Sequence, residues 1–362
     1  MSIVYFKFLR RRDPKKMEKA KNASPFSPNT PIVQFGLETA LTDTIGQLSP
    51  SSRRNYLIDA RQFVGWMIEQ GVTPAILSRS HAIAYRSFLQ ERYAKATAAR
   101  KLVVARRLLD EQRKRGKLAS NPFDDVKGFT LANETTHVVL KEQQAQALLD
   151  AIDTSTLLGL RDYALLLLLL RTGIRRSEAA SLRLADLSMD QGHYIATIQH
   201  GKGDMRRRVK VPVDVWREIA LYIEALRARH AEEMQRELAM LGADADAEQR
   251  QSIEQRHQVA LDDPLFVSFR RGDHPTRRPM GDKAIETQVK RYAEHLGLPL
   301  TPHGLRATFI TLALEHHAKL EQVQYAAGHR DPRTTERYQG RKLNLDDNAV
   351  DYVKVKKQNK EK

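Results

Sequence analysis

The most constraining feature of the sequence is an apolar segment near its middle. Ala164 to Leu170 is the longest unbroken apolar run, and it lies within a strongly apolar helix predicted from Leu157 to Arg171 and ended by Gly173. The run is far short of the roughly 20 apolar residues that a helix needs to cross a bilayer. We therefore expect this helix to belong to a globular domain, in a protein that has no membrane partner.

Length and charge indicate the number of domains and the kind of partner that the protein binds. A chain of 362 residues, with 41% hydrophobic and 29% charged residues, suits two globular domains. Its 60 Lys and Arg outnumber its 44 Asp and Glu, which gives a formal net charge of +16. Such a field favours polyanions, because basic side chains that neutralise phosphates release condensed counterions. A basic surface without a partner is the plainer alternative.

The chain has no cysteine. This excludes disulfides, thiolate metal sites and cysteine nucleophiles, and it fits a reducing compartment. The opening apolar residues, 3–6, precede the basic residues near them, which is the reverse of the order in a secretory signal. We expect a cytoplasmic protein that associates with the nucleoid when it is on DNA.

Composition divides the chain into segments. Residues 1–45 are predicted to form a flexible basic arm, residues 46–128 a helical domain, residues 137–345 a second domain and residues 346–362 a tail. Within the second domain, residues 230–263 are rich in Ala, Glu, Gln and Arg, which predicts an exposed helical insertion.

Helical periodicity predicts three helices in the first domain. One follows Ser49-Pro50 and stops at Gly71, and the others cover about 79–93 and 97–115. The last of these carries a dense set of basic residues, and we predict that four of them contact DNA: Arg100, Lys101, Arg106 and Arg107. A merely solvated basic face is the alternative.

Helix and strand patterns alternate in the second domain. A short helix is predicted over 141–152, before the apolar one. Alternating runs at 194–199 and 207–213 flank Gly201-Lys202-Gly203-Asp204, which is typical of a β-hairpin, and residues 265–269 resemble a strand. The predicted fold is mainly α, with an α+β second domain that contains a small antiparallel sheet.

The most informative polar residues lie in three separate segments. In the first, Arg175 and Glu178 follow the turn at Gly173. In the second, Thr301-Pro302 is a typical helix start that places His303 and Arg306 on one face. In the third, a helix over 320–327 ends at Gly328-His329, and Asp331-Pro332 begins another that carries Tyr338. Each residue alone has an ordinary structural explanation, but together and in this order they suggest a site.

This ordered set resembles the tyrosine recombinase family, also called the phage integrase family. The resemblance covers about 138–345, and the region 49–122 resembles the family's core-binding domain by pattern only. The matching motifs are Arg171-Thr172-Gly173-Ile174-Arg175-Arg176-Ser177-Glu178, the hairpin lysine Lys202, His303-Gly304-Leu305-Arg306, Gly328-His329 and the tyrosine Tyr338. One position departs, because Ala307 stands where the family often has a second histidine.

The resemblance implies a site-specific recombinase that cuts and rejoins DNA through a 3′-phosphotyrosyl bond, in the integration or excision of a mobile element. Arg175 and Arg306 would bind the phosphate, since guanidinium donates bidentate hydrogen bonds to it. Tyr338 would be the nucleophile, assisted by His303 and His329. Lys202 would be the general acid for the departing 5′-hydroxyl, and Glu178 would orient an arginine or the histidine.

The implied partners are double-stranded DNA at specific sites and three further copies of the chain in a homo-tetramer, with no metal or other cofactor. Lys210, on the same hairpin, is an alternative to Lys202. Two other functions stay open at this point. One is a type IB topoisomerase, which uses a similar set of residues, and the other is a DNA-binding regulator with an inactive recombinase domain.

Overall fold

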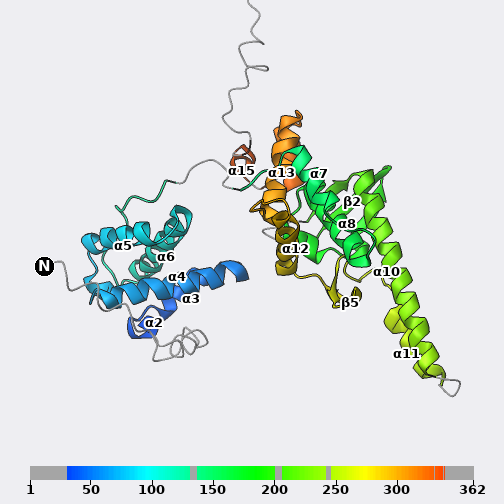
Figure 1. The fold of residues 1–362 in the computed structure, drawn as a ribbon. Helices are drawn as coiled ribbons and strands as arrows, with labels where there is room; N and C mark the ends of the chain where they lie inside the picture. Colours follow the sequence, from blue (N-terminus) through cyan, green and yellow to red (C-terminus); the bar gives the residue numbers. More distant parts are fainter. Residues whose placement is uncertain are drawn as a thin grey trace, which may run out of the picture. The chain divides into compact units, whose positions relative to one another are not determined.

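The computed structural model describes residues 31–130, 137–199, 206–241, 246–329, 331–336 and 338. The chain splits into two compact units, Met1–Ala132 and Asn133–Lys362, which are drawn in Figure 1. The predicted tail over 346–362, the first 30 residues of the predicted arm and Lys202 lie outside the described residues.

The described part of the first unit is helical. Its elements, coloured blue to cyan in Figure 1, are α2 (Pro31–Gln34), α3 (Glu38–Gly46), α4 (Pro50–Glu69), the 3₁₀ turn η1 (Pro74–Ile76), α5 (Arg79–Arg92) and α6 (Lys95–Lys114). Aromatic rings fill the centre: Phe63 on α4 lies 4.8 Å from Tyr85 on α5, and Tyr85 lies 5.0 Å from Trp66, measured between ring centroids. Edge-to-face and tilted pairs of this kind stabilise a small helical core beyond their burial alone.

The start of the first unit differs from the sequence prediction. Residues 31–45 were assigned to the flexible arm, whereas α2 and α3 lie there. Leu37, Ala40 and Leu41 are fully buried in the first unit's core, where α3 contacts α4 and α6. The segment is short and carries only a few apolar residues, so its periodicity was too weak to predict a helix; packing against the longer helices stabilises it instead.

The second unit begins with helices and a small sheet. Its first elements are α7 (Glu142–Asp150), α8 (Leu157–Thr172), α9 (Arg176–Ser181), η2 (Leu184–Asp186), β1 (Leu187–Asp190), β2 (His193–Ile198) and β3 (Arg207–Val211). The three strands form an antiparallel sheet in the order β1-β2-β3, in which Ala196 of β2 lies between Leu187 and Val209. The predicted hairpin is therefore the β2–β3 pair.

The rest of the unit is mostly helical. It contains α10 (Val213–Met240), α11 (Ala247–His257), β4 (Val267–Arg270), β5 (His274–Pro279), α12 (Asp282–Glu294), α13 (Pro302–Glu315), α14 (Leu320–Ala327) and α15 (Pro332–Glu336). Strands β4 and β5 form a second, two-stranded antiparallel sheet. These observations confirm the predicted fold class, and they add β1, β5 and α12, which the sequence patterns did not reveal.

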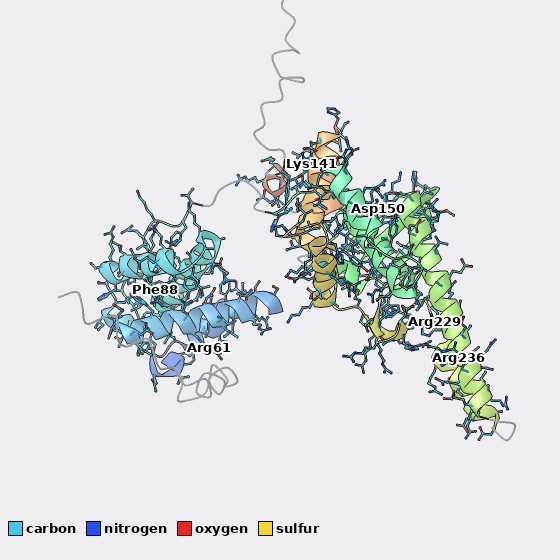
Figure 2. The ribbon with its side chains drawn as sticks, viewed as in Figure 1. Arg61, Phe88, Lys141, Asp150, Arg229 and Arg236 are labelled. Carbon is cyan, nitrogen blue, oxygen red and sulfur yellow. The ribbon has the colours of Figure 1, made fainter. Side chains whose placement is uncertain are left out.

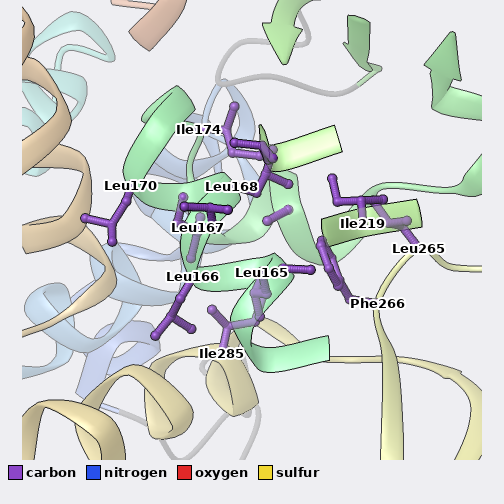
Figure 3. Packing of buried hydrophobic residues seen from close by; sticks show 14 of the residues in the cluster. Leu165, Leu166, Leu167, Leu168, Leu170, Ile174, Ile219, Leu265, Phe266 and Ile285 are labelled. Atoms are coloured by element: carbon purple, nitrogen blue, oxygen red, sulfur yellow. The ribbon is translucent and has the colours of Figure 1, made fainter. Parts of the chain in front are cut away.

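Helix α8 is the centre of this unit. Every residue from Ala164 to Leu170 is buried, and α8 contacts α7, α9, α10, α13 and β3. Figure 3 shows its leucines packed against Ile174, Ile219, Leu265, Phe266 and Ile285, which come from other parts of the unit. A helix that is apolar on all sides is stable only when neighbours surround it, so the apolar run fixes the arrangement of the whole unit.

Helix α8 ends at Gly173, whose φ of 62° is left-handed. A Cβ atom added there would lie 2.2 Å from Cδ1 of Phe309 on α13, so only glycine fits this turn. None of the helices that the structure describes is long and apolar enough to cross a membrane.

Candidate active site

Arg306 is buried on the first turn of α13, and its side chain is only 2% exposed. The predicted cap starts this helix, since the Thr301 side chain accepts a hydrogen bond from the Gly304 N–H. Arg306 Nη1 donates to the Gly173 carbonyl and Nη2 to the Ala327 carbonyl, each at 2.5 Å. Burial lowers the pKa of Arg306 to about 9, which leaves the guanidinium charged at neutral pH. Two helix C-termini thus hold this charge in a fixed place.

Arg175 lies immediately after the Gly173 turn, at the start of α9. Its Nη2 donates to the Gly328 carbonyl at 2.8 Å, and its Nη1 donates to Glu178 Oε1 at 2.8 Å. Ala327 and Gly328 are the last residue and the cap of α14. The C-terminal end of α14 therefore binds both Arg175 and Arg306.

Glu178 is 1% exposed and carries the negative charge that balances this group. Besides Arg175 it binds Arg207, whose Nη1 and Nη2 donate to Oε1 and Oε2, both at 2.8 Å. Burial by itself raises the pKa of Glu178, but the hydrogen bonds from Arg207 and Arg175 outweigh it, so the pKa is lowered. The carboxylate stays ionised at neutral pH. Orienting an arginine was one of the two roles expected for it.

Arg207 is the main residue of the site that sequence reasoning missed. It opens β3, and its guanidinium packs over Gly328: a Cβ atom added to that glycine would lie 2.7 Å from Arg207 Cζ. Gly328 also has a left-handed φ of 63°. The Gly-His motif therefore has a physical basis, because the glycine both ends α14 and makes room for Arg207. Arg207 stands in a run of basic residues, and nothing in that run indicated the contact with Glu178 or Gly328.

His303 lies beside the arginines on α13, with part of its side chain exposed to solvent and the rest covered by the site. Its ring is 4.2 Å from the ring of His137, in an edge-to-face arrangement. Burial, followed by the charges of His137 and Arg306, lowers the pKa of His303 to about 4. The imidazole is therefore neutral at neutral pH and has one N–H donor and one acceptor nitrogen. His137 was not predicted, since it stands between a polar segment and an apolar one, with no motif around it.

His329 and Tyr338 lie next to each other. Their rings are parallel to within 13° and have centroids 6.3 Å apart, and Tyr338 packs against buried residues of α13 and α14. His329 Nδ1 is 2.8 Å from the hydroxyl of Thr335, which is the penultimate residue of α15 and lies three residues before Tyr338. Burial and then the Arg306 charge lower the pKa of His329 to about 3.

Three of the residues described above, Arg175, His303 and Arg306, line a polar pocket. It is lined by Arg175, Arg176, Ser177, Asp282, Glu286, Thr301, Pro302, His303 and Arg306. The acids at its rim are neutralised, because Arg176 pairs with Asp282 and Glu286. Within the described residues, Nε of Arg306 is buried without a hydrogen-bond partner. A buried unsatisfied donor is costly, so the pocket suits an anion that accepts hydrogen bonds, such as a phosphate, better than a metal cation.

Lys202 cannot be placed, because it is outside the described residues. The rival lysine, Lys210, is exposed on β3 next to the buried residues Val209 and Val211. Side chains alternate along a strand, so Lys210 points away from the face on which Arg207 reaches Glu178. This orientation favours Lys202 over Lys210.

The four predicted DNA contacts on α6 have different surroundings. Lys101 is 5% exposed and binds the buried Asp59 at 2.8 Å, which corrects the prediction that it faces DNA. Arg106 is half-buried and donates to the carbonyls of Phe123 and Val126. Arg100 pairs with Asp59 but is 41% exposed, and Arg107 is exposed beside Tyr56. Only Arg100 and Arg107 retain surface for a phosphate.

The chain is similar to known proteins over much of its length. The model of the phage integrase family matches residues 138–343. Tyrosine recombinase XerD of Listeria monocytogenes serotype 4b (strain F2365) is 30% identical and aligns over 80% of this chain and 88% of its own. Tyrosine recombinase XerC of Myxococcus xanthus is 31% identical over 80% of this chain and 87% of its own.

The fold has a counterpart among solved structures. A lambda integrase dimer bound to a COC′ core site has a TM-score of 0.59 at 13% identity, over 91% of this chain and 82% of that one. The two chains share their fold, although little of their sequence is the same.

Proposed function

The chain belongs to the phage integrase family and is a tyrosine recombinase, and on that premise we propose how its site works on DNA. Arg175 and Arg306 bind the non-bridging oxygens of one phosphodiester. The observation that carries this assignment is the buried, unpartnered Nε of Arg306 beside a pocket that both arginines line. A phosphate oxygen in the pocket would accept the hydrogen bond that the described residues do not.

Tyr338 is the nucleophile in this proposal. Its hydroxyl oxygen attacks the phosphorus, the bond from phosphorus to the 5′-oxygen breaks, and a 3′-phosphotyrosyl ester forms. Lys202 gives a proton to the departing 5′-oxygen. A 5′-hydroxyl from another strand then attacks the ester, and the tyrosine takes a proton back. One phosphodiester is exchanged for another, so the two reaction steps together need no input of bond energy.

The two histidines differ in their proposed tasks. His303, neutral and accessible, accepts the proton of the tyrosine or donates to a phosphate oxygen. His329 holds the tyrosine segment: its ring lies against Tyr338, and its Nδ1 binds the Thr335 hydroxyl. A bound phosphate would stabilise the protonated form of either ring, because the negative charge offsets the neighbouring arginines.

Glu178 and Arg207 are positioning residues. Glu178 fixes the guanidinium of Arg175, and Arg207 links the base of the β2–β3 hairpin to the same carboxylate. Because Lys202 is five residues before Arg207, this anchor sets where the hairpin tip begins. A general acid must lie within hydrogen-bond reach of the leaving oxygen, so the anchor matters for catalysis.

We propose duplex DNA at specific sites as the substrate, with residues 46–128 and 137–345 as the DNA-binding and catalytic domains. Arg100 and Arg107 contact the backbone in the first of these. Exchange between two duplexes involves four strands, which supports a homo-tetramer on DNA. Integration or excision of a mobile element is the biological use that the sequence favours.

Covalent trapping tests this proposal. The full chain is incubated with fragmented host DNA, denatured with detergent, and assayed for protein that carries DNA. Adducts should form with the wild type and with Tyr325→Phe, a control tyrosine 63% exposed on α14, but not with Tyr338→Phe. Adducts absent from the wild type under all conditions would support the inactive DNA-binding regulator instead.

Sequencing the trapped DNA identifies the site. If the trapped DNA contains junctions between a mobile element and its host, the enzyme integrates or excises that element. If it contains one recurrent chromosomal locus instead, the proposed role in a mobile element is wrong. Two duplexes that carry the recovered site then separate a recombinase from a topoisomerase, because only the former exchanges strands between them.

A further inference from the structure

A cluster of histidine and glutamate side chains is formed by residues that take no part in the active site. It occupies the predicted insertion, where the second half of α10 runs beside α11. Figure 1 shows α10 extending past the body of its unit, with α11 packed along its far part. In Figure 2, Arg229 and Arg236 mark this part of α10. The two helices share little apolar surface, since Ile253 is the only buried apolar residue of α11.

Three side chains meet between the helices. His230 and Glu233 are one turn apart on α10, and His257 is the last residue of α11. One ligand atom from each residue lies within 4.8 Å of the other two. Residues three apart share a helix face, which is why His230 and Glu233 point toward the same partner. The ligands of a tetrahedral zinc ion lie about 3.3 Å apart, for bonds near 2.0 Å.

Both histidines are buried, and the hydrogen bonds of the described residues leave the His257 ring without a partner. The His230 side chain is 8% exposed and that of His257 is 10% exposed. Both ring nitrogens of His257 are buried without a hydrogen-bond partner among the described residues. Its Nε2 lies 3.2 Å from Glu237 Oε1, but without the geometry of a hydrogen bond. A buried nitrogen lone pair without a donor carries a desolvation cost that a bound cation would remove.

We propose that His230, Glu233 and His257 bind a divalent transition-metal ion of the zinc class, with the fourth position open to Glu237 or water. Two imidazoles and a carboxylate are a ligand set that zinc, cobalt and nickel accept, whereas calcium and magnesium prefer oxygen alone.

The ion would join two helices that otherwise hold each other weakly. It would also reach the second sheet, because Glu233 Oε1 lies 3.5 Å from His274 Nδ1 at the start of β5. The role is structural: the ion fixes the insertion against the unit, and strand cleavage at Tyr338 proceeds without it. The plainer alternative is a set of His–Glu contacts that binds no metal tightly.

Cobalt titration tests the site directly. Full-length protein without a purification tag is stripped with a chelator and titrated with Co²⁺ while the visible absorption is recorded. We expect one equivalent to bind with the intense bands of a tetrahedral site, and Zn²⁺ to displace it. His257→Ala and the isosteric Glu233→Gln should each weaken binding by about 100-fold or more, as loss of a direct ligand exceeds the loss of an outer partner.

Two controls make the result decisive. His295→Ala removes an exposed histidine at the end of α12 and should leave the affinity unchanged. His303→Gln removes the histidine that lies against His137 and reports any metal bound at the active site. Zn²⁺ should raise the thermal unfolding midpoint of the wild type but not of His257→Ala. Equal affinity in the wild type, His257→Ala and Glu233→Gln, or loss of the cobalt bands in His303→Gln alone, would overturn the proposal.

Discussion

Arg207 donates two hydrogen bonds to Glu178, both at 2.8 Å, and so links the β2–β3 hairpin to the carboxylate that also holds Arg175. The pair is almost completely shielded, with side-chain exposures of 10% and 1%. Two parallel bonds between a guanidinium and a carboxylate fix both distance and orientation.

Replacing Arg207 tests whether this link positions the site. Arg207→Ala leaves Glu178 with Arg175 alone, so the strand-cleavage rate should fall by about 100-fold, as expected when catalytic groups shift by about 1 Å. Arg207→Lys keeps the charge but loses the paired geometry and should be intermediate. Single-turnover cleavage of the recovered site measures the rate. DNA affinity should not change, and the exposed neighbour variant Arg208→Ala should cleave normally; equal losses in both variants would indicate a general charge effect.

Arg175→Lys tests phosphate binding. A lysine retains one positive charge but cannot make bidentate hydrogen bonds, so cleavage should slow by about 100-fold, the usual cost of one donor to a developing oxyanion. Gel-shift affinity should stay near that of the wild type. Arg171→Lys, an exposed arginine four residues earlier, is the matched control. A variant that loses affinity and cleavage in the same proportion would place Arg175 in ordinary DNA binding.

Gly328→Ala separates backbone strain from contact with Arg207. Gly328 and Gly297 have φ values of 63° and 64°, so alanine should cost each about 1 kcal/mol of folding free energy. A Cβ atom at Gly297 meets nothing within 4 Å, whereas one at Gly328 meets the Arg207 guanidinium. Urea unfolding should therefore show similar small losses, while cleavage falls only in Gly328→Ala. Full activity in that variant would contradict the close packing described for Arg207.

Substituting Lys202 tests the general acid. Lys202→Ala should abolish cleavage of normal DNA but not of a substrate whose bridging 5′-oxygen is replaced by sulfur, since a thiolate leaves without a proton. Lys210→Ala should cleave both substrates at the wild-type rate. If Lys210→Ala, and not Lys202→Ala, loses cleavage of normal DNA and regains it with the sulfur-containing substrate, Lys210 is the general acid.

Stability should depend on pH through His303 and His329. Their pKa values in the folded chain are about 4 and about 3, whereas an unfolded histidine titrates near 6.5. Below about pH 6.5 the unfolded chain therefore binds protons that the folded chain does not, so the free energy of unfolding falls as the pH falls. Urea midpoints at pH 7.5 and pH 5 should differ less in His303→Gln/His329→Gln than in the wild type. An identical pH dependence would exclude the two rings as its source.

Local signals predicted the framework of the site. Thr301-Pro302 starts α13, Gly173 ends α8 and Gly328 ends α14, because capping depends on neighbouring residues and on a left-handed φ that glycine tolerates. The positions of Arg175 and Arg306 follow from these turns, so their motifs could be recognised along the chain.

The sequence patterns did not predict contacts between residues that are far apart in the chain. Arg207 reaches a carboxylate 29 residues away, and Lys101 is buried because Asp59, 42 residues earlier, faces it. A basic residue that binds an internal carboxylate and one that faces DNA look the same in a helical pattern. Whether a long charged side chain is buried or faces solvent depends on which group the fold places opposite it. The sequence does not reveal that group, and the packed structure does.

The carbonyl groups at the end of α14 have a consequence for solution conditions. They cannot gain or lose protons, and those that bind Arg306 are shielded from solvent ions along with it. The contacts of Arg306 with these carbonyls should therefore persist as salt rises, for as long as the unit stays folded and the guanidinium, whose pKa is about 9, stays charged. Encounter with DNA should instead weaken steeply as salt rises, because it depends on counterion release. The protein thus separates its attraction to DNA, which the salt concentration controls, from the position of Arg306, which the salt concentration does not control.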